Sequence, residues 1–90
     1  LPALVVARSA LGTINHTLLT LEALRGRGVS VAGVVLVGEP NADNRDAIAD
    51  YGRVPVVGEL PRLAPLVPRA LDAWARTSLD AQGLLLRWLR

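Results

Sequence analysis

The sequence predicts an α/β fold, half of a doubly wound parallel sheet in which three strands alternate with helices. Three apolar runs rich in β-branched residues, at about 3–7, 30–37 and 54–57, have the length and composition of buried parallel strands. The segments between them show helical spacing or helix-capping signals and end in glycines. This β-α-β-α-β order, with right-handed crossovers, predicts a single partial domain over residues 1–90.

The first strand, about Ala3–Ala7, leads through a glycine turn into the first helix, about Ile14–Arg27. The strand is apolar throughout, so we expect it to be buried on both faces. Thr13 is a candidate N-cap, because its hydroxyl can accept a hydrogen bond from a first-turn N–H. Gly28 follows the helix at the position where a left-handed residue is favoured, which predicts the end of the helix.

The second strand, about Ser30–Val37, is also apolar on both faces, which predicts a central place in a covered parallel sheet. A turn cluster follows it, in which Asn41 or Asp43 can cap a short helix. That helix runs over about Ala42–Tyr51, and Gly52 ends it.

The third strand, about Val54–Val57, contains Pro55, which favours an edge position or the first residues of a strand. Residues 58–61 are expected to form a loop at its carboxyl end. Apolar residues at helical spacing predict one or two helices between residues 69 and 89, with Ser78 as an N-cap.

Composition indicates that the chain buries surface against something outside itself. Hydrophobic residues make up 51% of its 90 residues, and the mean hydropathy is +0.35. A domain of this size has proportionally more surface to cover with polar groups than a larger one. The excess predicts burial against another half of the domain or against a dimer partner.

Several function classes are disfavoured by residue content. The chain has no cysteine and one histidine, His16, which argues against thiolate catalysis and a Cys/His metal site. All ten basic residues are scattered arginines among few aromatics, so no nucleic-acid partner is expected. No apolar run approaches the ~20 residues of a membrane span, and the first residues lack a signal-peptide pattern. We therefore expect a cytoplasmic protein without a membrane partner.

The loops after the three strands are the candidate ligand sites, because doubly wound sheets bind ligands beyond the carboxyl ends of their strands. These loops are residues 8–15, 38–41 and 58–63. The first loop enters a helix whose N-terminus offers free N–H groups and the positive end of the helix dipole, with no acidic residue from 2 to 21. This arrangement predicts an anion site. The alternative is that Thr13 and Asn15 only cap the helix.

The same residues resemble a known enzyme family. The matching segments are Gly12-Thr13-Ile14-Asn15-His16-Thr17-Leu18-Leu19-Thr20-Leu21-Glu22-Ala23-Leu24, Arg27-Gly28-Val29 and Val31-Ala32-Gly33-Val34-Val35. Together they resemble dethiobiotin synthetase from about Leu4 to Leu63. The resemblance implies a fold of the P-loop NTPase type, a homodimer, and a ligase of biotin biosynthesis. It also implies ring closure of 7,8-diaminononanoate with carbon dioxide to dethiobiotin, with ATP and Mg²⁺.

The resemblance further implies two binding sites on this chain. The start of the first helix would bind the carboxylate of the substrate across the dimer interface, through backbone N–H groups and an asparagine. The corresponding residues are Leu11, Gly12, Thr13, Ile14 and Asn15. The second and third loops would hold the nucleotide base, and the corresponding residues are Val37, Gly38, Pro61, Arg62 and Leu63.

Three departures from the family pattern limit what this chain can do. Val37 stands where the family has an asparagine and Pro68 falls near an acidic position, which puts adenine preference in doubt. The chain has no lysine and no G-x-x-x-x-G-K-[ST] motif. ATP and Mg²⁺ would therefore be bound mainly by residues absent from this chain, in a truncated part or a separate P-loop-bearing chain. We do not expect activity from the chain alone, and no catalytic or metal-binding residue is assigned.

Other interpretations remain open. His16 could be a general base, but a histidine in a first helical turn is more typical of a packed or solvent-bridging residue. The acidic residues Glu39, Asp43, Asp46 and Asp50 could hold magnesium, although nearby arginines favour a solvated helix face. The whole chain could instead be a non-catalytic dimerisation or interaction module, or a fragment of a related P-loop ATPase.

Overall fold

The computed structural model describes residues 2–10, 12–61 and 67–85. Strands and helices alternate along the chain in the predicted order. The elements are β1 (Ala3–Arg8), α1 (Thr13–Gly26), β2 (Val31–Val37), α2 (Ala42–Gly52), β3 (Val56–Leu60) and α3 (Pro68–Ser78). None of the helices in the described ranges is long and apolar enough to cross a membrane.

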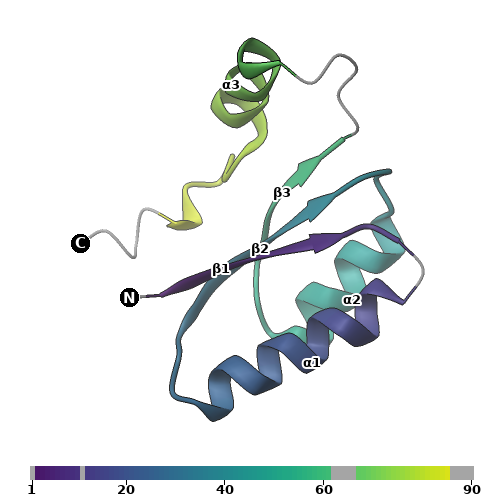
Figure 1. Cartoon of the computed structure of the whole chain (residues 1–90), viewed down its shortest axis with the longest axis vertical. Coiled ribbons are helices and arrows are strands. Elements are labelled where there is room, and N and C mark those ends of the chain that lie inside the picture. Colours follow the sequence, from purple (N-terminus) through teal and green to yellow (C-terminus); the bar gives the residue numbers. More distant parts are fainter. Residues whose placement is uncertain (1, 11, 62–66, 86–90) are drawn as a thin grey trace.

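The strands form one parallel sheet in the order β1-β2-β3, which confirms the predicted half-sheet and the central place of β2. α1 and α2 pack side by side below the sheet, and α3 lies on its other side, beyond β3 (Figure 1). β2 is buried along almost its whole length. The sheet therefore has one well-covered face, and its second face is covered only near β3.

The core lies between the sheet and the two lower helices. Its fully or nearly buried members are Leu21, Val34, Leu36, Ile48 and Val54. Gly52 lets α2 approach α1, because a Cβ on it would lie 2.7 Å from Leu21 Cδ1. Arg25 of α1 fastens the same junction, since its guanidinium donates to the carbonyl oxygens of Gly52 and Arg53 at 2.6 and 3.0 Å. This packing holds the carboxyl-terminal ends of the two helices together beside the sheet.

The prediction that β1 is buried on both faces is wrong. Exposure alternates along the strand: Val5 and Ala7 pack against the core, whereas Leu4 and Val6 are 45% and 65% exposed. An apolar run of this kind is typical of a strand covered on both sides. Here nothing in the described ranges covers the second side.

Two of the predicted helix signals act as expected, and a third does not. Asn41 caps α2, because its Oδ1 accepts from the N–H of Asn44 at 3.0 Å, and Gly28 takes a positive φ of 76° after α1. Thr13 is not an N-cap. Gly12 holds that position with a φ of 85° and Thr13 is already helical, buried to 6% exposure.

The third strand begins later than predicted, and residues 58–60 belong to it rather than to a loop. Pro55 cannot donate to the ladder, so the strand starts after it. The partners of β2 then jump from Val56 to Gly58, which leaves Val57 as an extra, bulged residue. Because of this bulge, Gly58 faces α3, where an added Cβ would lie 3.2 Å from Trp74.

Ser78 ends α3 and does not cap a second helix, contrary to prediction. The turn after α3 is fixed by Asp80, which has a positive φ of 53°. Its carboxylate accepts from the N–H groups of Leu84 and Leu85 at 2.7 and 2.8 Å. Asp80 also donates its own N–H to Val57 O in the bulge. The segment after α3 is thereby tied to the outer edge of β3.

Candidate functional site

The loops after the three strands are tied together at the carboxyl edge of the sheet. Ser9 N donates to Val37 O at 2.7 Å, and Gly38 N donates to Leu60 O at 2.8 Å. Ser9 Oγ also donates to Glu39 O at 2.6 Å. Gly38 has a φ of 123°, a conformation that side chains rarely adopt. The first and second loops therefore form one connected surface, and the third begins beside it.

A hollow of about 670 Å³ opens between the first two loops. One wall is the start of α1, with Gly12, Thr13, Ile14 and Asn15, which are four of the five residues predicted to bind a carboxylate. The fifth, Leu11, lies outside the described residues. The opposite wall comes from the second loop and α2, and includes Glu39, Asn41 and Asn44.

The wall formed by α1 has the chemistry of an anion site. Thr13 N donates to Ala10 O and His16 N to Gly12 O, which fixes the turn that enters the helix. Ile14 and Asn15 lie in the first turn, where a backbone N–H has no acceptor within the helix. No acidic residue occupies that turn, and Asn15 is exposed with an amide that can donate. These groups can hold one carboxylate at the mouth of the hollow.

The predicted base-binding residues are only partly brought together. Val37 ends β2, Gly38 follows it, and Pro61 follows β3; the bond from Gly38 N to Leu60 O places the two loops side by side. Arg62 and Leu63 lie outside the described residues. Val37 is half-buried and offers an apolar side chain where an amide was expected. The backbone of Gly38 is the polar group that remains at this position.

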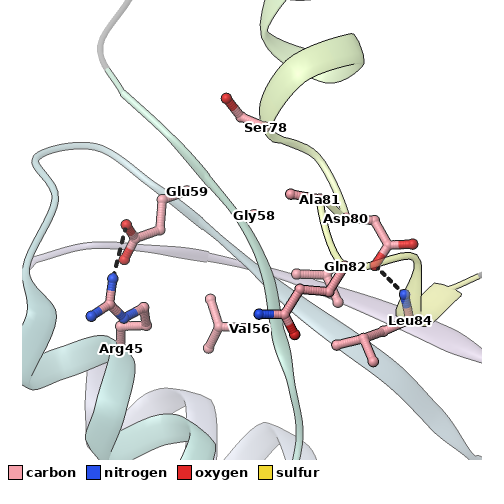
Figure 2. A pocket seen from close by; sticks show the side chains of 10 residues that line it. Arg45, Val56, Gly58, Glu59, Ser78, Asp80, Ala81, Gln82 and Leu84 are labelled. Atoms are coloured by element: carbon pink, nitrogen blue, oxygen red, sulfur yellow. Dashed lines mark hydrogen bonds and ion pairs between the residues drawn. The ribbon is translucent and has the colours of Figure 1, made fainter.

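The acidic residues near α2 do not gather into a metal site. Within the described ranges no group of three or more histidine or acidic side chains could hold a metal ion. Arg45 instead lies between Asp46 and Glu59, with N···O distances of 3.3 and 3.8 Å. Figure 2 shows Arg45 and Glu59 on one side of β3 and the turn with Asp80 and Gln82 on the other.

His16 lies outside the hollow that holds Asn15. It is exposed, and its ring lies near Gly12, where an added Cβ would be 3.5 Å from His16 Cδ2. It lines a separate groove beside β1, together with Thr13 and Thr17. The interpretation of His16 as a packed or solvent-bridging residue rather than a general base stays a prediction.

Sequence reasoning did not single out Ser9 or Asn44. Ser9 was within the predicted first loop, but its link to Glu39 joins residues 30 positions apart. Asn44 was only the third residue after a predicted cap. The available signal was the presence of polar residues directly after a strand. This signal does not show which of these residues contact each other in the fold.

Comparison with known proteins identifies the class of protein to which the chain belongs. A family model described as an AAA domain matches residues 1–70, and the chain belongs to this family. With its parallel half-sheet, the chain is P-loop NTPase-like in fold.

Within this class the resemblance to dethiobiotin synthetase is confirmed. The chain is 51% identical over 85 residues to the biotin biosynthesis bifunctional protein BioCD of Bordetella avium, covering 94% of this chain and 18% of that protein. It is 45% identical over 82 residues to the ATP-dependent dethiobiotin synthetase BioD of Rhodopseudomonas palustris, covering 91% and 39%. With the BioD of Agrobacterium fabrum it is 54% identical over 71 residues, covering 79% and 34%. The chain thus spans between 18 and 39% of the length of these relatives.

Proposed function

We propose that this chain is the part of a dethiobiotin synthetase that holds the carboxylate end of 7,8-diaminononanoate during its ATP-dependent ring closure with carbon dioxide. The observation that carries the proposal is the hollow whose wall is Gly12 to Asn15, found in a chain about half identical to named dethiobiotin synthetases. In this proposal the chain also supplies the loops around Gly38 and Pro61 to the nucleotide base. It further forms part of a homodimer interface in a cytoplasmic enzyme.

The residues of the hollow act by binding and orientation. The N–H groups of Ile14 and Asn15 and the positive end of the α1 dipole stabilise a carboxylate. The bonds of Ser9 to Val37 and Glu39 hold the second loop against the start of α1. A substrate whose carboxylate end is fixed presents its reacting end at a constant position. This lowers the entropic part of the barrier to ring closure.

ATP and Mg²⁺ do not fit the residues of this chain by themselves. A triphosphate is cradled by a glycine-rich loop with a lysine, and this sequence has no lysine. The described residues also lack a group of metal ligands. We therefore expect isothermal titration of the isolated chain with Mg²⁺ and ATP to show no tight binding. Tight binding would contradict this division of roles.

The carboxylate site is tested with Asn15→Ala in an enzyme completed by the rest of the domain. That remainder is the part of the Rhodopseudomonas palustris synthetase outside the 82 aligned residues, produced in the same cells. We expect the KM for 7,8-diaminononanoate to rise about tenfold with kcat changed less than twofold, because a carboxylate contact distant from the reaction contributes uniform binding. Glu22→Ala, an exposed change on the same helix, is the matched control. Equal KM values in the two variants would overturn the site.

A second candidate function is a non-catalytic interaction module, and the apolar Val37 in the second loop is the observation that favours it. Under that function the completed protein forms a complex but makes no dethiobiotin. Asn15→Ala would then leave partner binding unchanged.

A further inference from the structure

We propose that Ser9 is a positioning residue shared by the carboxylate site and the loops assigned to the nucleotide base, and that it acts through its hydroxyl. This inference rests on the proposed function, which assigns those two ligands to this edge of the sheet. The hydroxyl of Ser9 acts on the backbone that carries both sites. The hydrogen bonds at the carboxyl ends of the three strands support this role.

Two hydrogen bonds join Ser9 to the second loop. Its N–H donates to Val37 O at 2.7 Å, which continues the pairing of β1 with β2 past the end of β1. Its Oγ donates to Glu39 O at 2.6 Å. The backbone bond reaches only the last residue of β2, whereas the hydroxyl holds the backbone on the far side of Gly38. The side chain of Ser9 therefore sets the course of the second loop after it leaves the sheet.

Gly38 lies between these two anchored residues and depends on the hydroxyl of Ser9. Its φ is 123°, and a Cβ built on it would lie 3.7 Å from the Cβ of Ser9. Glycine has more accessible backbone conformations than other residues, so the loop needs an outside contact to keep one course. The N–H of Gly38 donates to Leu60 O at 2.8 Å. A displacement of Gly38 would therefore also release the start of the third loop.

Ser9 also lies at the entrance to α1. Ala10 N donates to Arg8 O and Thr13 N to Ala10 O, both at 3.0 Å, so consecutive turns lead from Ser9 to the start of the helix. Ser9 and Glu39 line the same hollow as the first turn of α1. The bond between them joins the two walls of that hollow. Its loss would let the wall that offers N–H groups move relative to the opposite wall.

The first test measures the position of the loops in this chain without any ligand. Amide hydrogen exchange, followed by NMR, compares the wild type with Ser9→Ala and Ser9→Thr. We expect the Gly38 amide to exchange about fivefold faster in Ser9→Ala, because the loss of one hydrogen bond frees the loop locally. The Val34 amide, which donates to Pro55 O at 2.9 Å within the sheet, should keep its rate. Ser9→Thr retains the hydroxyl and should restore the wild-type rate at Gly38.

Two results of the exchange experiment would overturn the inference. One is an unchanged rate at Gly38 in Ser9→Ala. The other is equal acceleration at Gly38 and Val34, since Ser9 would then support the whole sheet rather than the loops.

The second test uses the enzyme completed by the unmatched part of the Rhodopseudomonas palustris synthetase. In Ser9→Ala we expect the KM values for 7,8-diaminononanoate and for ATP each to rise about fivefold, with kcat changed less than about twofold, because binding groups are displaced and reacting groups are not. Ser9→Thr should restore both values. Thr20→Ala is the matched control, since its hydroxyl also donates to a backbone carbonyl, that of His16 at 2.9 Å, but within α1. It should leave both KM values unchanged.

Asn15→Ala separates the two sites in the same assay. It should raise the KM for 7,8-diaminononanoate and leave the KM for ATP unchanged, whereas Ser9→Ala raises both. A rise in only one KM in Ser9→Ala, or a fall in kcat with both KM values unchanged, would overturn the inference. A wild-type complex that makes no dethiobiotin would overturn the proposed function instead, and the exchange rate at Gly38 would then test the role of Ser9 by itself.

Discussion

The two edges of the sheet are built in opposite ways. At β3 the strand is bulged at Val57, and the N–H of Asp80 donates to the carbonyl oxygen of that bulged residue. Trp74 of α3 covers the same edge and donates from Nε1 to Glu59 O at 2.8 Å. At β1 the described residues provide no such cover, and Leu4 and Val6 face outward.

The difference indicates where the sheet ends. A bulge in the edge strand and a covering segment are devices that stop further strand pairing, and β3 has both. β1 lacks such a cover within the described ranges, and the register shift between Ala3 and Leu4 places the extra residue on β2 rather than on β1. Leu4 and Val6 on β1 are among the large apolar side chains that the described fold leaves exposed.

The largest effect is expected at the covered edge, with Trp74→Ala. The change removes a half-buried indole from Gly58 together with its bond to Glu59 O, so we expect the free energy of unfolding to fall by about 2–3 kcal/mol. Trp74→Phe keeps most of the ring and should lose about 1 kcal/mol. Urea unfolding followed by circular dichroism measures both. A loss below about 0.5 kcal/mol for Trp74→Ala would show that α3 does not protect the edge.

The next effect concerns the turn that fastens the segment after α3. Asp80→Ala removes the acceptor of two backbone N–H groups and places alanine at positive φ, so a loss of about 1–2 kcal/mol is expected. Asp80→Asn retains an acceptor and tolerates the left-handed conformation, and should cost less. The same unfolding experiment compares the two, and equal losses would mean that the side-chain bonds contribute little.

Beside β1, Thr17→Val should raise the free energy of unfolding rather than lower it. It replaces an unpaired buried hydroxyl by a methyl group, so the isolated chain should gain about 1 kcal/mol. Thr20→Val is the control, because that hydroxyl already has a partner and is exposed. If Thr17→Val lowers the free energy of unfolding as much as Thr20→Val does, the buried hydroxyl of Thr17 does not destabilise the chain.

The smallest effect is expected for Leu4→Thr in the isolated chain. Leu4 is partly exposed already, and its replacement by a β-branched residue of good strand propensity should change stability by less than about 0.5 kcal/mol. A loss above about 1 kcal/mol in urea unfolding would indicate that this face is covered in the isolated chain, which contradicts the contrast between the edges.

The order of the strands and helices, and several of the positions at which they begin or end, could be predicted from the sequence. Asn41 and Gly28 act at short range, and their positions followed from local chemistry. Thr13 was misjudged because the left-handed Gly12 moved the start of α1 by one residue. The bulge at Val57 and the role of Asp80 depend on contacts between distant segments, which no local pattern contains. For β1, apolar character predicted burial correctly only for the side that this chain itself covers.

The candidate site was predicted in part. Gly12, Thr13, Ile14 and Asn15 do line one hollow, as a strand, a glycine turn and a helix start imply. The opposite wall, with Asn41 and Asn44, depends on how α2 packs beside α1, and this could not be derived from spacing.

Dethiobiotin formation by the completed protein tests the central claim most directly. The tagged chain is copurified with the unmatched part of the Rhodopseudomonas palustris synthetase and supplied with 7,8-diaminononanoate, bicarbonate, Mg²⁺ and ATP, and dethiobiotin is quantified by mass spectrometry. We expect product from the complex and none from either part alone. A stable complex that makes no dethiobiotin, or product from this chain without the remainder, would contradict the account.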